Sequence, residues 1–216
     1  MFQNVLRAHD RNYQFSTTSQ FSGWMTGELV RNSVRVLRVH VAGDFYDVDY
    51  TRKWLEIVRH SGRVTFFAYT RSWRDDAILP ELIALSELPN FVMWFSLDRE
   101  TGPAPLVETV RTAYMAIDDM DADVAPDDCD LVFRDIKRRR VPMKYTASGV
   151  LVCPAENGVQ GKHKHNCSSC GVCWNRSRKP DWRTALLPFM EHDGISIDVP
   201  FSDLITEEHS LARAHA

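Results

Sequence analysis

Short apolar runs alternate with amphipathic segments along most of the chain. The clearest run begins at Val34, where closely spaced valines and a leucine lead towards Gly43 and Asp44. A run with so few polar interruptions is typical of a strand buried on both faces of a parallel sheet. Shorter runs of the same kind predict further strands over residues 64–69, 91–95, 114–117, 131–133 and 150–152.

Three segments between these runs have apolar residues at helical spacing. In the first, the apolar residues are Phe21, Trp24, Met25, Leu29 and Val30. In the second, they are Tyr50, Trp54, Ile57 and Val58. Asp47 can cap the second helix and Gly62 can end it, while Asp75 or Asp76 can cap a third helix over residues 78–88.

The alternation of strands and helices predicts an α/β fold, with a parallel sheet covered by outer helices. Six strands are too few to close an eight-stranded barrel, so we expect a partial, open, barrel-like parallel sheet. We expect residues 1–152 to form this core, 153–178 a cysteine-rich metal-binding segment and 179–216 a carboxyl-terminal extension. Residues 1–18 are polar and weakly patterned, and they predict no regular element.

The composition is that of an ordinary soluble globular protein, with 44% hydrophobic and 25% charged residues. No apolar run approaches the roughly 20 residues that cross a bilayer, and the amino end has no signal-peptide pattern. We therefore expect a cytoplasmic protein that does not enter a membrane. The formal net charge of −3 provides no general attraction to nucleic acid.

Two local basic runs change this picture in part. One covers residues 176–179, and the other consists of Lys137, Arg138, Arg139 and Arg140. Such a run can contact the phosphates of a nucleic acid, although runs of like charge are more often solvated surfaces. Both interpretations remain open from the sequence.

Four of the five cysteines fall within one stretch, at Cys153, Cys167, Cys170 and Cys173. Two-residue gaps let a tight turn aim successive sulfurs at one point, and a remote fourth cysteine followed by proline resembles iron–sulfur ligation. We therefore predict a [4Fe–4S] cluster, with zinc as the alternative and His163 and His165 as reserve ligands. A disulfide scaffold fits poorly, because the chain is long, poor in cysteine and without a secretion signal. Cys129 is interpreted as a separate structural thiol.

Polar residues follow directly after several of the predicted strands. These candidate ligand-binding residues are His40, Gly43, Asp44, Arg71, Asp98 and Glu156. Ligands of parallel α/β sheets bind at the carboxyl ends of the strands, so we expect these residues to share one edge with Cys153 and to bind a small molecule. Structural interpretations also exist. Asp44 and Asp98 can stabilise turns, and His40 can be a core histidine.

Five blocks of the sequence resemble the gene product 88 family of actinobacterial phages and plasmids. They cover residues 38–46, 66–73, 94–98, 152–158 and 167–174, and the last reads Cys-Ser-Ser-Cys-Gly-Val-Cys-Trp. The family looks like a distant relative of the radical S-adenosylmethionine enzymes, which implies a partial barrel with cysteine clusters. By the same resemblance, Ala-Gly-Asp at residues 42–44 takes the place of the motif that holds the methionine amino group of S-adenosylmethionine.

The family pattern includes a further cysteine group upstream of the segment that matches residues 9–15, whereas this sequence has no cysteine before Cys129. We therefore expect a truncated chain, or a variant, that lacks a radical-generating cluster. Two functions follow as alternatives: an iron–sulfur protein of a mobile-element family, or a zinc-stabilised, non-enzymatic module that binds nucleic acid or protein. A metal-dependent hydrolase fits least, because four thiolates leave no open metal position.

Overall fold

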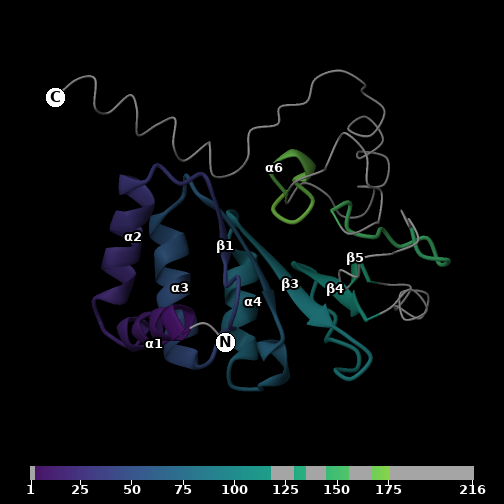
Figure 1. The fold of residues 1–216 in the computed structure, drawn as a ribbon, viewed down its shortest axis with the longest axis horizontal. Coiled ribbons are helices and arrows are strands. Elements are labelled where there is room, and N and C mark those ends of the chain that lie inside the picture. The colour runs from purple at the N-terminus through teal and green to yellow at the C-terminus, as the bar shows by residue number, and fades with distance from the viewer. Residues whose placement is uncertain (1–2, 118–128, 135–144, 156–166, 176–216) are drawn as a thin grey trace. The chain divides into compact units, whose positions relative to one another are not determined.

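The computed structural model of this chain describes residues 3–117, 129–134, 145–155 and 167–175 (Figure 1). The chain divides into two compact units. The first unit comprises Met1–Phe95 and Pro105–Val110, and the second comprises Ser96–Ala104 and Arg111–Ala216. The domain boundaries expected after residues 152 and 178 stay predictions.

Five strands form one open sheet, in which they follow one another in chain order. The strands are β1 (Val36–Val39), β2 (Thr65–Thr70), β3 (Phe91–Leu97), β4 (Val110–Ala116) and β5 (Leu131–Arg134). The pairs β1–β2, β2–β3 and β4–β5 are parallel, which confirms the predicted α/β fold with an open parallel sheet. The sixth predicted strand, over residues 150–152, instead forms isolated bridges: Val152 pairs with Val132, and Leu151 pairs with Tyr145.

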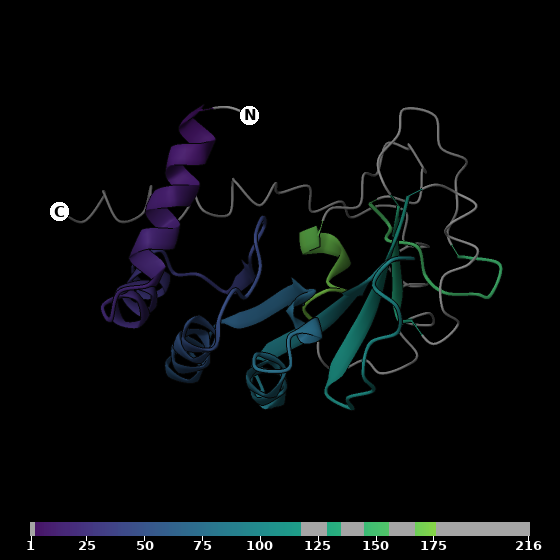
Figure 2. The ribbon, with the colours of Figure 1, turned by 90° about the horizontal axis from the view of Figure 1, so that it is seen from below.

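Helices α3 (Val48–His60) and α4 (Leu79–Glu87) lie on the same face of strands β1 to β3 (Figure 2). Helix α2 (Phe21–Arg31) packs against α3, which in turn packs against α4. Strands β2 and β3 are buried along almost their whole length. The run that begins at Val34 was expected to be buried on both faces, and this is wrong: it forms the edge strand β1, in which only Val39 is buried.

Helix α3 agrees closely with the sequence pattern. Its four apolar positions at helical spacing are all buried: Tyr50, Trp54, Ile57 and Val58. The Asp47 carboxylate accepts a hydrogen bond from the Tyr50 N–H at 2.6 Å, so the predicted N-cap is confirmed. The helix ends at His60, two residues before Gly62.

The amino-terminal region differs from the expectation. Residues Gln3–Ser16 form helix α1, although the sequence pattern predicted no element there, and Ser16 is its only buried residue among those described. The segment is polar overall, so its few apolar residues did not stand out as a helix face in the sequence. In α2 the predicted face is also partly wrong, because Trp24 is 51% exposed and Val30 is 75% exposed.

The start of α4 is a second correction. Ile78 occupies the N-cap position and makes no side-chain capping bond, so neither Asp75 nor Asp76 is the cap. Asp75 instead stabilises the turn that leads into α4. Its carboxylate accepts from the Ala77 N–H at 2.9 Å, and its carbonyl accepts from Ile78 and Leu79. The preceding turn is the short helix η1 (Ser72–Arg74).

Several predicted features lie outside the described residues. They are the basic runs at residues 137–140 and 176–179, Glu156, His163, His165 and the extension at 179–216. Within the part of the chain that the structure describes, no helix combines the length and apolar character needed to cross a bilayer.

Replacing Asp47 by Ala should lower the free energy of unfolding by about 1 kcal/mol, because one N–H of the first turn of α3 loses its acceptor. Chemical denaturation of the two proteins measures this difference. Asp47→Asn is the matched control, since asparagine caps helices about as well as aspartate. An equal loss in both variants would show that the carboxylate acts through its charge and not as a cap.

Candidate functional site

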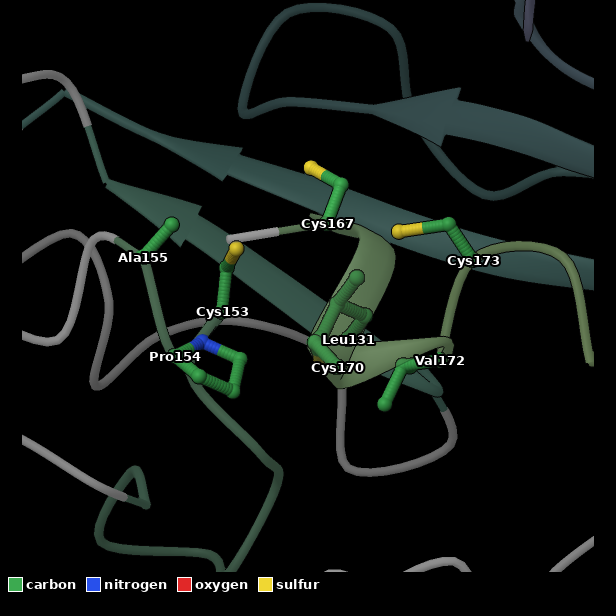
Figure 3. A pocket seen from close by; sticks show the side chains of 8 residues that line it. All are labelled: Leu131, Cys153, Pro154, Ala155, Cys167, Cys170, Val172 and Cys173. Atoms are coloured by element: carbon green, nitrogen blue, oxygen red, sulfur yellow. The ribbon is translucent and has the colours of Figure 1, made fainter. Parts of the chain in front are cut away.

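The four clustered cysteines line one pocket in the second unit. Its lining consists of Leu131, Cys153, Pro154, Ala155, Cys167, Cys170, Val172 and Cys173 (Figure 3). The figure shows the Cys173 sulfur pointing towards the Cys167 side chain, while Cys153 approaches from the strand side. The enclosed volume is small, about 20 Å³, which is the space of about one water molecule or single ion.

Cys153 is held by the edge of the sheet. Its N–H donates to the Val132 carbonyl at 2.8 Å, and the Val132 N–H donates to the Leu151 carbonyl at 2.8 Å. These two bonds continue the parallel ladder beyond β5, so the main chain at Cys153 is placed by the strand. The cysteine is buried, and Leu131 of β5 lies beside it in the pocket lining.

The other three cysteines come from one tight turn. Cys167–Cys170 forms the single helical turn α6, and the Gly171 N–H donates back to the Cys167 carbonyl at 3.0 Å. Gly171 has a φ of 66°, a left-handed conformation that glycine adopts without a steric penalty. The chain therefore reverses after α6, and Cys173 returns to the same pocket.

Burial raises the pKa of the Cys170 thiol; the nearby Cys167 also raises it, whereas the backbone of Val172 lowers it by hydrogen bonding. Cys167 is exposed, so the two ends of α6 differ in their access to solvent. Cys129 is buried elsewhere: it does not line the pocket, and its sulfur lies 3.8 Å from the Leu131 carbonyl.

Among the described residues, no group of three His, Cys, Asp or Glu side chains lies close enough together to hold a metal ion. The cysteines thus share a pocket, but their sulfurs do not adopt a coordination geometry. Metal ligation by these four residues stays a prediction, as do the reserve roles of His163 and His165.

A second group of candidates lies at the carboxyl ends of β1 and β2 in the first unit. Asp44 accepts three hydrogen bonds there: from the Phe45 N–H at 2.8 Å, the Thr70 hydroxyl at 2.5 Å and the Arg71 N–H at 2.7 Å. The carboxylate therefore ties the loop after β1 to the loop after β2. Gly43, with a φ of 91°, makes the turn that brings Asp44 into position.

His40 is an unusual residue of the same loop. Its φ of 61° lies in the left-handed region, where residues other than glycine are uncommon. Its Nε2 is 2.8 Å from the Tyr50 hydroxyl, and its Nδ1 is buried without a hydrogen-bond partner among the described residues. Burial lowers the pKa of His40 to about 4, although Asp44 raises it in part, so the imidazole is neutral at pH 7.

Asp98 belongs to the second unit and stabilises a turn. Its carboxylate accepts from the N–H groups of Glu100 and Thr101, both at 2.9 Å. The edge that it was expected to share with His40, Asp44 and Arg71 stays a prediction, as does binding of a small molecule there. Contact of residues 137–140 with nucleic acid also stays a prediction.

Two residues outside the predicted candidate set position these sites. Thr70 binds Asp44 from the end of β2, and Arg111 binds the cysteine turn from β4. Arg111 lies before the strand predicted over residues 114–117, so no pattern in the sequence marked it.

The sequence model of one family, described as gene product 88, matches residues 1–176. The chain belongs to the gene product 88 family. The gene product 88 match includes the Asp44 loop, the parallel strands and all four pocket cysteines. No curated protein and no solved structure matches the chain.

The buried, neutral His40 predicts acid sensitivity. Its pKa is about 4 in the folded chain and 6.5 in the reference state, so the unfolded chain takes up a proton first as the pH falls. Stability should therefore drop between pH 6.5 and pH 4, by at most about 3 kcal/mol. Urea unfolding at a series of pH values measures the loss.

The matched variant for this test is His40→Asn, because asparagine tolerates the left-handed backbone and does not titrate. The variant should show a shallower decline over the same pH range. An unchanged decline would assign the acid sensitivity to other groups.

Proposed function

We propose that this gene product 88 protein is a metal-binding protein that holds a [4Fe–4S] cluster through Cys153, Cys167, Cys170 and Cys173. One observation carries the proposal: cysteines from two separate segments of the chain line a single pocket. Thiolates that are free of disulfide bonds are the ligands that iron–sulfur clusters use.

The chemistry of the lining fits such a centre. The remaining residues that line the pocket are apolar: Leu131, Pro154, Ala155 and Val172. An apolar lining lowers the polarity around the cysteines, which is one of the factors that set the potential of an iron–sulfur centre. When bound, the cluster would supply one-electron transfer or a rigid cross-link between the turn and the sheet.

Zinc is the second candidate, because cysteine thiolates are also the ligands of structural zinc sites. Four thiolates also complete the tetrahedral shell that structural zinc sites use. The proposed role is then stabilisation of the turn in a non-enzymatic binding module.

Substituting any one of the four pocket cysteines by Ser should lower the retained metal by about tenfold or more, because the ligand set becomes incomplete. The measurement is iron, sulfide and zinc content after anaerobic purification, together with the visible absorption of the protein. Cys129→Ser is the matched control and should retain the full amount.

A clear outcome against the proposal is a wild-type protein that binds neither iron nor zinc after anaerobic reconstitution with each. Equal metal loss in Cys129→Ser would also contradict the assigned ligand set. Iron with sulfide supports the cluster, and zinc alone supports the second candidate.

We further expect that the chain does not cleave S-adenosylmethionine. Radical cleavage needs an iron with an open coordination position, and four cysteines fill all the positions that a cubane offers to the protein. Reduced, reconstituted protein incubated with S-adenosylmethionine should yield no 5′-deoxyadenosine. Formation of 5′-deoxyadenosine by the protein would show that one of the four cysteines is not a ligand.

A further inference from the structure

An arginine lies buried in the strand next to the cysteine pocket. Arg111 is the second residue of β4, and only 6% of its surface is exposed. A guanidinium group is costly to bury unless its N–H groups find acceptors. Two of these acceptors are main-chain carbonyls of the cysteine turn: Val172 at 3.1 Å and Asn175 at 2.8 Å.

The strand register places Arg111 on the face of the sheet that carries the pocket. Ala113 of β4 pairs with Leu131 of β5, and alternate residues of a strand share one face. Arg111 therefore lies on the same face of the sheet as Leu131, which lines the pocket. The guanidinium reaches from this face to the turn that carries Cys173.

The two carbonyls lie on either side of Cys173, the residue of the turn that lines the pocket. Val172 directly precedes Cys173, and Asn175 closes the turn by donating its own N–H to the Gly171 carbonyl at 2.9 Å. A planar, forked donor can hold two such carbonyls at once, whereas the single ammonium of lysine acts as a point charge. The contact therefore determines where the turn sits on the sheet.

The charge of Arg111 has a second consequence. Four thiolates outweigh the positive charge of either a zinc ion or an oxidised cubane, so the loaded site carries a net negative charge. A buried cation beside that site stabilises the negative charge, and it does so most for the most reduced state.

We propose that Arg111 is the positioning residue of the cysteine site. It anchors the turn from Gly171 to Asn175 on β4 and offsets the charge of the bound metal centre. The second role rests on the proposed metal binding; the anchoring role does not.

The test compares Arg111→Met, Arg111→Lys and, as the matched control, Arg99→Met, which removes an exposed arginine of the same unit. Alkylation of Cys173 in the metal-free protein, followed by mass spectrometry, reports the anchoring without any metal. Arg111→Met should speed alkylation by about tenfold or more, because two charge-assisted hydrogen bonds to the turn are lost. Arg111→Lys should be intermediate, and Arg99→Met should match the wild type.

The effect of the Arg111 charge is measured on the metal-reconstituted proteins. Arg111→Met should have a more negative reduction potential than the wild type, whereas Arg111→Lys should stay near it because the positive charge remains. If zinc is the bound metal, the corresponding readout is zinc affinity, which should fall most in Arg111→Met. Circular dichroism checks folding; if Arg111→Met does not fold, the alkylation rate of Arg111→Lys decides the anchoring.

Alkylation at the wild-type rate in both Arg111 variants would overturn the anchoring role. A wild-type potential or zinc affinity in Arg111→Met would overturn the charge role. A wild-type protein without bound metal refutes the proposed function and the charge role, and leaves the alkylation result to decide the anchoring.

Discussion

Parallel hydrogen bonding between short, buried strands is the constraint on which the rest of the structure depends. A parallel pair needs a long crossover, and α3 and α4 supply it between β1, β2 and β3. Because the paired strands run in the same direction, their carboxyl ends lie next to each other. This is why Asp44, after β1, can accept hydrogen bonds from Thr70 and Arg71 at the end of β2. In the second unit, the same ladder continues past β5 and positions Cys153.

The cysteine pocket depends on main-chain contacts more than on contacts of the sulfurs themselves. Strand bridging holds Cys153, a left-handed Gly171 reverses the chain, and Arg111 binds the turn that follows. Each of these features orders the backbone of the pocket in the absence of a bound ligand. A pocket ordered in this way loses less conformational entropy on binding than a free loop does. The raised pKa of Cys170 acts in the opposite direction, because a metal must displace its proton.

The polar edge of the first unit is organised differently. Asp44 directs its carboxylate to its own chain and joins two loops, so its most evident role is structural. His40 has two energetically unfavourable features. Its backbone is left-handed, and its buried Nδ1 has no hydrogen-bond partner among the described residues. Packing against the rings of Phe45 and Tyr50 stabilises the neutral imidazole in this position. The surrounding structure therefore holds a conformation that the local sequence disfavours.

Local sequence determined the elements whose pattern and burial agree. The apolar runs of β2 and β3 and the capped, one-sided pattern of α3 were predictable, because strand and helix periods are properties of neighbouring residues. Cysteine spacing likewise predicted a tight turn that carries three of the cysteines, whereas convergence of their sulfurs on one metal centre stays a prediction. Helix α1 escaped prediction, since a mostly exposed helix needs no apolar stripe. The hydrogen bonds of Asp44 with Thr70 and of Arg111 with Val172 join residues 26 and 61 positions apart. Only the tertiary structure decides such contacts, because strand register and crossover path determine which acceptor a polar side chain meets.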